Sequence, residues 1–232
     1  MSNIAPINRV TRSKAEAKAS YDKMSGWYDL LAGLSEKKYK DMGLKMLETQ
    51  PGEIVLEVGF GTGQCLLKLR QAVGEHGHVY GIDLSEGMLN VAQSRIINAG
   101  LGEDIELSCG NAIRLPYADN RFHAIYSSFT LELFDTPEIP IVLNECQRVL
   151  KPGGRMCIVA MSKKPAGSLM VKLYEWVQQR YTKYVDCRPI YVEQEIRDTG
   201  FLIESVTEMS MFGLPVDVVL AKKHYSMEAE EE

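Results

Sequence analysis

A glycine-rich loop and a separate acid form the part of the sequence best suited to chemistry. Residues 57–63 read Glu-Val-Gly-Phe-Gly-Thr-Gly and follow directly after a short apolar, β-branched run. Glycines in such a loop let a ligand approach the backbone closely. Asp83 lies 20 residues after Gly63, at the end of a second apolar run, near the offset at which an acid meets a ribose diol in nucleotide-binding folds. The pattern predicts a nucleoside site at two strand ends.

The charge and spacing of this loop favour a cationic nucleoside over a dinucleotide. A dinucleotide fingerprint needs a third small residue at the position where this chain has Gln64. A pyrophosphate binds amide N–H groups and a helix N-terminus, whereas Glu57 puts a carboxylate at the start of the loop. S-adenosylmethionine carries an ammonium and a sulfonium group, which a carboxylate attracts. An NAD-dependent oxidoreductase stays a competing interpretation.

Alternating strand and helix patterns indicate the fold that must hold this loop. Short apolar runs predict strands, and amphipathic stretches between them predict helices. The predicted strands are 54–58, 79–83, 105–109, 123–127, 156–160, 202–207 and 216–221, and the predicted helices are 15–50, 66–73, 85–99, 137–150 and 193–199. Such alternation is typical of an α/β protein with a doubly wound, mostly parallel, seven-stranded Rossmann-like sheet and helices on both faces.

The length of 232 residues suits one large domain with a smaller addition. We expect an N-terminal helical extension, or cap, over residues 1–50 and the sheet domain over residues 51–225. Residues 226–232 form an acidic tail. A late helical lid is expected at about 165–200, where apolar and aromatic positions recur at helical spacing, namely Leu169, Leu173, Trp176, Val177 and Tyr181.

Composition excludes several classes of function. The net charge of −5 disfavours a nucleic-acid substrate. Nucleic acids are polyanions and bind mainly to basic surfaces, where they release counterions. The five cysteines lack a C-x-x-C pair, which disfavours a disulfide framework or a zinc site, and the four histidines show no metal-ligand spacing. The first twenty residues lack the apolar core of a secretory signal, and the chain contains no apolar stretch long enough for a spanning helix. We expect a cytoplasmic protein without a metal and without a transmembrane segment.

Four motifs in order resemble those of the class I S-adenosylmethionine-dependent methyltransferases. They are the loop at 57–63 and the segments 81–89 (GIDLSEGML), 110–117 (GNAIRLPY) and 148–155 (RVLKPGGR). The segment YDKMSGWYD at 21–29 is further similar to the ubiquinone/menaquinone biosynthesis C-methyltransferases. The resemblance implies that residues 51–225 form the S-adenosylmethionine-binding methyltransferase domain, which releases S-adenosyl-L-homocysteine as product.

The resemblance also implies roles for particular residues. Three glycines would line the methionine part of the cofactor, Asp83 the ribose hydroxyls, and the segments after the second and third predicted strands the adenine. The expected cofactor-binding residues are Tyr21, Glu57, Gly59, Gly61, Gly63, Asp83, Leu84, Met88, Asn111, Ala112 and Ser127. The family more often has Asp at the position of Asn111, whose amide supplies an acceptor without charge. Tyr21 and Tyr28 are expected either to cover the cofactor or to fasten the N-terminal helix.

Methyl transfer from a sulfonium is an in-line displacement, for which a protein aligns the reactants and excludes water. An acceptor that must lose a proton needs a base within hydrogen-bond reach. Glu132 and Tyr28 are the candidates for that catalytic role.

The acceptor expected from the resemblance is a small apolar or aromatic molecule, quinol-like or lipid-soluble, and peripheral contact with a membrane is left open. Two alternatives also stay open, namely a phospholipid or small-amine N-methyltransferase and a noncatalytic protein that binds S-adenosylmethionine. The oligomeric state and the atom methylated are not predicted.

Overall fold

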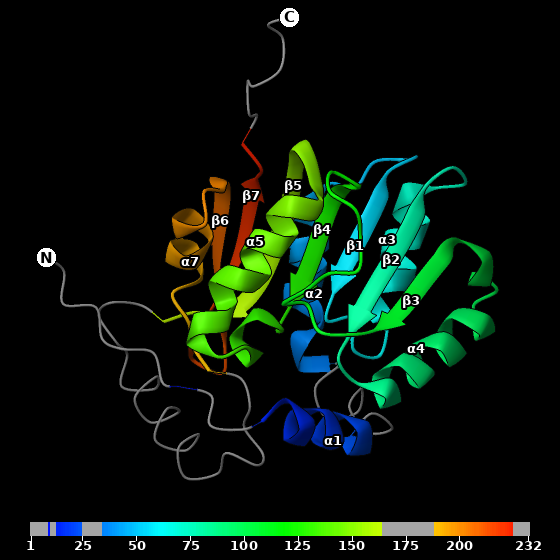
Figure 1. Ribbon diagram of the computed structural model, residues 1–232, viewed down its shortest axis with the longest axis horizontal. Coiled ribbons are helices and arrows are strands. Elements are labelled where there is room, and N and C mark those ends of the chain that lie inside the picture. The colour runs from blue at the N-terminus through cyan, green and yellow to red at the C-terminus, as the bar shows by residue number, and fades with distance from the viewer. Residues whose placement is uncertain (1–8, 10–12, 25–33, 164–187, 225–232) are drawn as a thin grey trace, which may run out of the picture.

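Seven strands of the described chain form one sheet (Figure 1). The computed structural model describes residues 9, 13–24, 34–163 and 188–224. The strand order is β3-β2-β1-β4-β5-β7-β6. All neighbours from β3 to β5 are parallel, whereas β7 is antiparallel to both β5 and β6. The strands are β1 (Ile54–Val58), β2 (His78–Asp83), β3 (Ile105–Cys109), β4 (Phe122–Ser128), β5 (Leu150–Met161), β6 (Leu202–Met211) and β7 (Leu214–Lys222). The predicted fold class is confirmed.

Helices cover both faces of the sheet, because the central strands are apolar on both sides. Buried side chains of α2, α3 and α4 form a cluster with one face, and those of α5 and α7 with the other. The helices are α1 (Lys14–Met24), α2 (Leu34–Leu47), α3 (Gln64–Val73), α4 (Glu86–Asn98), α5 (Ile139–Val149) and α7 (Val192–Asp198). Short 3-10 turns lie at η2 (Gly102–Asp104), η3 (Leu131–Leu133) and η4 (Thr136–Glu138).

The N-terminal region, predicted to be helical over 15–50 in two amphipathic stretches, contains two separate described helices. Helix α2 packs on the sheet, whereas α1 lies across the edge at which the parallel strands end (Figure 1). Residues 25–33, between them, lie outside the described residues. The extension thus contributes one helix to the core and one to the strand-end edge of the sheet.

Strand β5 is longer than predicted. The pattern predicts a strand at 156–160, but β5 begins at Leu150, which already pairs with Phe122. The register then shifts before Ala124 pairs with Arg155. Gly153 takes a positive φ of 71°, so the glycines form an irregularity within the strand rather than a turn before it.

The last two strands form a hairpin that extends beyond both predicted ranges. Pairing continues to Met211 and Leu214, and the connecting Phe212 and Gly213 have φ values of 53° and 82°. Positive φ at both central residues is the conformation of the tight hairpin turn that matches strand twist. The helix predicted around Leu169–Tyr181 and the tail at 226–232 lie outside the described residues. Helix α7, within the range expected for the lid, packs on the sheet.

Candidate active site

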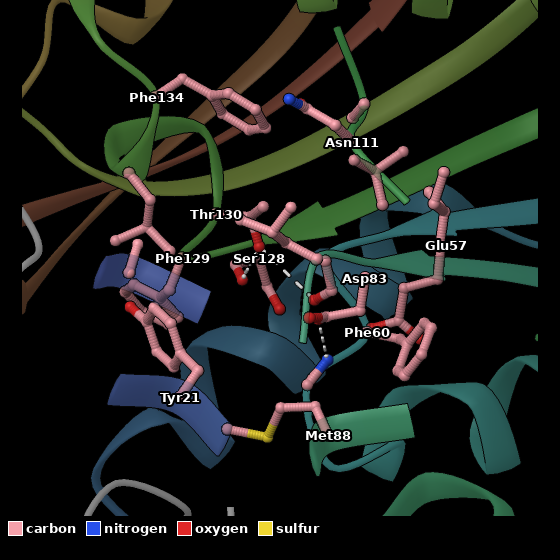
Figure 2. Close-up of a pocket in the computed structure, with 18 of the residues that line it drawn as sticks. Tyr21, Glu57, Phe60, Asp83, Met88, Asn111, Ser128, Phe129, Thr130 and Phe134 are labelled. Atoms are coloured by element: carbon pink, nitrogen blue, oxygen red, sulfur yellow. Dashed lines mark hydrogen bonds between the residues drawn. The ribbon is translucent and has the colours of Figure 1, made fainter. Parts of the chain in front are cut away.

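A cavity of about 360 Å³ lies at the carboxyl ends of the central parallel strands. Its wall comes from the glycine loop after β1, the end of β2, the turn after β3 and the residues that follow β4 (Figure 2). Helix α1 contributes Lys14, Ala17 and Tyr21, and Ser13, directly before this helix, also lines the cavity. Ligands in open α/β sheets bind at this edge, and the volume lies within the range of small-molecule sites.

The three glycines of the loop have different surroundings although all have positive φ. A Cβ on Gly59 would collide with the Thr130 side chain at 2.2 Å. A Cβ on Gly63 would meet Ala92 of α4 at 2.9 Å, whereas a Cβ on Gly61 would meet nothing within 4 Å. Gly59 and Gly61 line the cavity. Gly63 is not among the lining residues and instead allows α3 and α4 to pack closely.

Asp83 ends β2 and joins the loop to the start of α4. One carboxylate oxygen accepts a hydrogen bond from the Gly61 N–H at 2.9 Å (Figure 2). The other accepts one from the Ser85 N–H at 2.9 Å. Burial raises the pKa of Asp83, although these N–H donors oppose the shift. Ser85 caps α4, because its hydroxyl oxygen accepts a hydrogen bond from the Met88 N–H. Asp83 therefore faces the cavity in a fixed orientation.

Glu57 is a buried carboxylate on the wall of the cavity. Its side chain is 2% exposed, and among the described residues its Oε2 atom has no hydrogen-bond partner. Burial raises its pKa well above the usual range, while the charge of Lys40 opposes that shift. A buried polar atom without a partner is costly. The carboxylate thus favours a ligand that brings a hydrogen-bond donor or a positive charge.

Apolar side chains and one amide form another part of the cavity wall. Leu84, Met88 and Ala112 line the cavity together with Asn111, and Figure 2 shows Met88 and Asn111 on either side of Asp83. The Asn111 side-chain oxygen accepts a hydrogen bond from the Ile113 N–H at 3.2 Å, so the amide is fixed by its own turn. Apolar side chains beside one fixed amide suit an aromatic base with polar edges.

Comparison with known proteins decides the family. A model of the ubiE/COQ5 methyltransferase family matches residues 7–209. The chain belongs to this family. A demethylmenaquinone methyltransferase of Geobacillus kaustophilus is 32% identical over 193 residues, which cover 74% of this chain and 80% of that protein. The ubiquinone/menaquinone biosynthesis C-methyltransferase UbiE of Vibrio cholerae is 32% identical over 169 residues, which cover 73% of this chain but 63% of that protein.

Solved structures agree with this membership. A SAM dependent methyltransferase from Aquifex aeolicus is 25% identical, with a TM-score of 0.63 over 89% of this chain and 98% of that chain. The [4+2]-cyclase SpnF is similar in fold alone, with 19% identity and a TM-score of 0.77 over 96% of this chain and all of that chain. As a member of the ubiE/COQ5 family, the protein is an S-adenosylmethionine-dependent methyltransferase.

The cavity fits the cofactor of the family on two independent features. The unpartnered oxygen of Glu57 matches a donor such as the ammonium group of S-adenosylmethionine. The open space beside Gly61 leaves room for a ligand against the backbone. Within the described ranges, no group of three or more His, Cys, Asp or Glu side chains is arranged to hold a metal ion.

The structure brings most of the predicted residues to the cavity of this family member. Those that line it are Tyr21, Glu57, Gly59, Gly61, Asp83, Leu84, Met88, Asn111 and Ala112. Ser127 does not line it, because its hydroxyl donates to the Val58 carbonyl at 2.9 Å on the neighbouring strand. The next residue, Ser128, does line it, since successive side chains of a strand point to opposite faces. Tyr28 lies outside the described residues.

Glu132, predicted as a base, is not among the residues that line the cavity. Its side chain is fully buried. One carboxylate oxygen accepts a hydrogen bond from the Met161 N–H at 3.1 Å at the end of β5, and burial raises its pKa to about 8. In the structure, therefore, Glu132 supports the end of β5 from behind the cavity wall.

Several lining residues had not been predicted from the sequence. They come from α1 and the residue before it, from α2 and from the segment after β4, and are Ser13, Lys14, Ala17, Lys40, Phe129, Leu133, Phe134, Asp135 and Glu138. The acids in this set form ion pairs, Asp135 with Arg9 and Glu138 with Lys14, each at 2.6 Å. The segment after β4 was a detectable candidate, because the residues that follow parallel strands lie at the ligand edge.

Proposed function

We propose that this methyltransferase transfers the methyl group of S-adenosylmethionine to a quinol-type aromatic acceptor. The observation that carries the proposal is the set of aromatic side chains on the cavity wall, to which α1 contributes Tyr21 and the residues after β4 contribute Phe129 and Phe134 (Figure 2). Aromatic side chains stack on flat apolar rings at little entropic cost. The two relatives are named as a demethylmenaquinone methyltransferase and a ubiquinone/menaquinone biosynthesis C-methyltransferase, and these names support the same class of acceptor.

Methyl transfer requires the protein mainly to align the two reactants and to exclude water. The bound cofactor supplies an electrophilic methyl group on a positively charged sulfur. The chain's own residues hold the two reactants about 3 to 3.5 Å apart and keep water out. Helix α1 and the segment η3–η4 enclose the acceptor end. Because an aromatic carbon gains nucleophilicity from a neighbouring hydroxyl group, the reduced quinol is the reactive form of such an acceptor.

The base that removes the acceptor proton stays a prediction. Tyr28 is the remaining candidate that the sequence offers, since Glu132 does not line the cavity. Tyr28→Phe is expected to lower kcat by about 100-fold, the usual contribution of a general acid or base. Binding of S-adenosylmethionine by the same variant is expected to stay unchanged. A variant with full activity would exclude Tyr28 as the base.

Transfer of labelled methyl groups tests the proposed function. We expect the label to enter a reduced demethylated benzoquinol or naphthoquinol, and to enter neither the oxidised quinone nor phosphatidylethanolamine nor a panel of small amines. Label in the phospholipid or the amines would instead support N-methylation. No transfer to any acceptor, with S-adenosylmethionine bound, would support a noncatalytic binding protein.

A lipid-soluble acceptor also has a consequence for where in the cell the protein acts. Among the described residues, no helix combines the length and hydropathy that crossing a bilayer requires. We propose that the protein is cytoplasmic and meets its acceptor at the membrane surface. Co-sedimentation with vesicles that contain a quinol tests this, and a protein that stays in the supernatant with and without quinol would contradict it.

A further inference from the structure

Lys40 is a lysine of α2 whose side chain reaches the wall of the cavity. The side chain is 16% exposed and lines the cavity beside Glu57 and Cys65. Its charge acts on both of these groups. Cys65 lies in the first turn of α3, directly after the glycine loop. Lys40 therefore belongs to the part of the cavity wall formed by the glycine loop and the start of α3.

Helix α2 holds Lys40 in place from behind. The Tyr126 hydroxyl on β4 donates a hydrogen bond to the Lys40 backbone carbonyl at 3.0 Å. One turn later, Gly43 lies so close to the sheet that an added Cβ would meet Val159 at 2.6 Å and Tyr126 at 3.0 Å. The absence of a side chain at Gly43 thus lets α2 approach β4 and β5 closely. The backbone of Lys40 is fixed against the central strands.

Lys40 stays a cation in this position. Burial lowers the pKa of its ammonium group, but the ion pair with Glu36, at 2.7 Å, and the other acidic groups nearby together outweigh burial and raise the pKa above the usual value. Burial raises the pKa of the Cys65 thiol, so this neighbour is neutral and does not neutralise the lysine. The other lysine on the described wall, Lys14, pairs with Glu138 at the acceptor end.

The charges at the glycine-loop end match a zwitterion. The amino-acid part of S-adenosylmethionine has an ammonium and a carboxylate on the same carbon. The ammonium of the cofactor favours the ionised form of Glu57, and this carboxylate would repel the cofactor's own carboxylate if no cation were near. The N-terminus of α3 adds a partial positive charge, which favours an anion without fixing its position.

We propose that Lys40 binds the carboxylate of S-adenosylmethionine and, together with Glu57, selects ligands that have an intact amino-acid end. Lys40 then binds the carboxylate of the zwitterion, and Glu57 binds its ammonium group. The inference concerns cofactor binding and is independent of which acceptor is methylated.

Calorimetric binding of paired ligands tests this role. S-adenosylhomocysteine has the carboxylate, and decarboxylated S-adenosylmethionine and 5′-methylthioadenosine lack it. Lys40→Met is expected to weaken binding of S-adenosylmethionine and S-adenosylhomocysteine by about 10- to 100-fold, the loss of a charge-assisted hydrogen bond. The same variant is expected to bind both carboxylate-free ligands within about two-fold of the parent protein. Lys40→Arg should recover part of the loss, and Lys45→Met, at an exposed position of α2, should change nothing.

A second pair of variants guards against misfolding. Lys40→Met leaves the buried Glu36 without its cation, so Glu36→Gln alone and Glu36→Gln with Lys40→Met are compared as a pair. The difference in ligand affinity between these two variants again gives the contribution of Lys40. Equal weakening of all ligands, or no weakening of any, would overturn the proposal. A parent protein that binds none of the ligands would instead remove the cofactor assignment itself.

Discussion

The Asp83 carboxylate accepts a hydrogen bond from the backbone N–H of Gly61 at 2.9 Å and so ties the end of β2 to the loop that follows β1. The two strands are parallel neighbours, with Ile82 opposite Val58. The bond therefore crosses between adjacent strand ends at the point where the cavity begins. Asp83 determines the shape of the glycine loop as well as the charge that faces the nucleoside.

Asp83→Asn is expected to weaken binding of S-adenosylmethionine by about 1 to 3 kcal/mol. An amide has one acceptor oxygen, so its NH₂ group must face the N–H of either Gly61 or Ser85. Titration calorimetry measures the effect. Asp198→Asn, at an exposed position of α7, serves as the control. Unchanged affinity in the Asp83 variant would remove this residue from the cofactor site.

The parts of the site that could be predicted from the sequence are those in which the signal is local. The glycine loop, Asp83 and the Ser85 cap each follow from residues that are adjacent or within one turn, because strand ends and helix starts are coded by short patterns. The wall from α1 and α2 could not be predicted in this way. Lys40 and Lys14 reach the cavity through packing between distant segments, and their own neighbours in the sequence contain no sign of it.

Local patterns also fail where identical residue types have different surroundings. Ser127 and Ser128 are adjacent, and the sequence does not say which one faces the cavity, because that depends on strand register. Gly61 and Gly63 likewise share a motif and a positive φ, yet Gly61 faces open space whereas Gly63 packs against Ala92. Only the three-dimensional arrangement of α4 assigns Gly63 to packing.

Gly61→Ala and Gly63→Ala are expected to fail in different ways. A Cβ at Gly61 enters open space beside the ligand, so this variant should bind S-adenosylmethionine at least about 10-fold more weakly, with a loss of about 1 kcal/mol in stability from the positive φ. A Cβ at Gly63 meets Ala92 at 2.9 Å, so that variant should lose about 2 to 3 kcal/mol of stability. Urea unfolding and calorimetry on both proteins separate the two effects. Equal losses in both measurements would contradict the assignment.

The contact of α1 with the start of α4 is expected to control how fast the cofactor leaves. Asp22 on α1 accepts hydrogen bonds from the Ser85 hydroxyl at 2.6 Å and from the Gly87 N–H at 2.9 Å. Asp22→Ala removes both, so α1 should open more often and S-adenosylmethionine should dissociate about 10-fold faster. Stopped-flow displacement measures this rate. Asp41→Ala on α2, away from the cavity, is the matched control, and the same rate in both variants would show that α1 does not retain the ligand.

Glu132 is expected to make the stability of the protein depend on pH between about 4.5 and about 8. The ordinary pKa of a glutamate, 4.5, applies to the unfolded chain, and burial raises the pKa of Glu132 to about 8 in the folded protein. Between these values the folded state keeps a proton that the unfolded state has lost. The free energy of unfolding therefore falls as the pH rises, by up to about 1.4 kcal/mol for each pH unit.

Glu132→Gln should remove this dependence, because an amide cannot ionise yet its oxygen still accepts from the Met161 N–H. Urea unfolding at pH 5, 6.5 and 8 is expected to show similar stability for the variant and the parent at pH 5, and a growing advantage for the variant at higher pH. Glu75→Gln, at an exposed turn, corrects for the loss of charge alone. Since Glu132 does not line the cavity, methyl transfer should persist in the variant. Parallel curves of unfolding free energy against pH for the variant and the parent would mean that burial does not raise the pKa of Glu132. Loss of methyl transfer with stability retained would show that Glu132 takes part in the reaction.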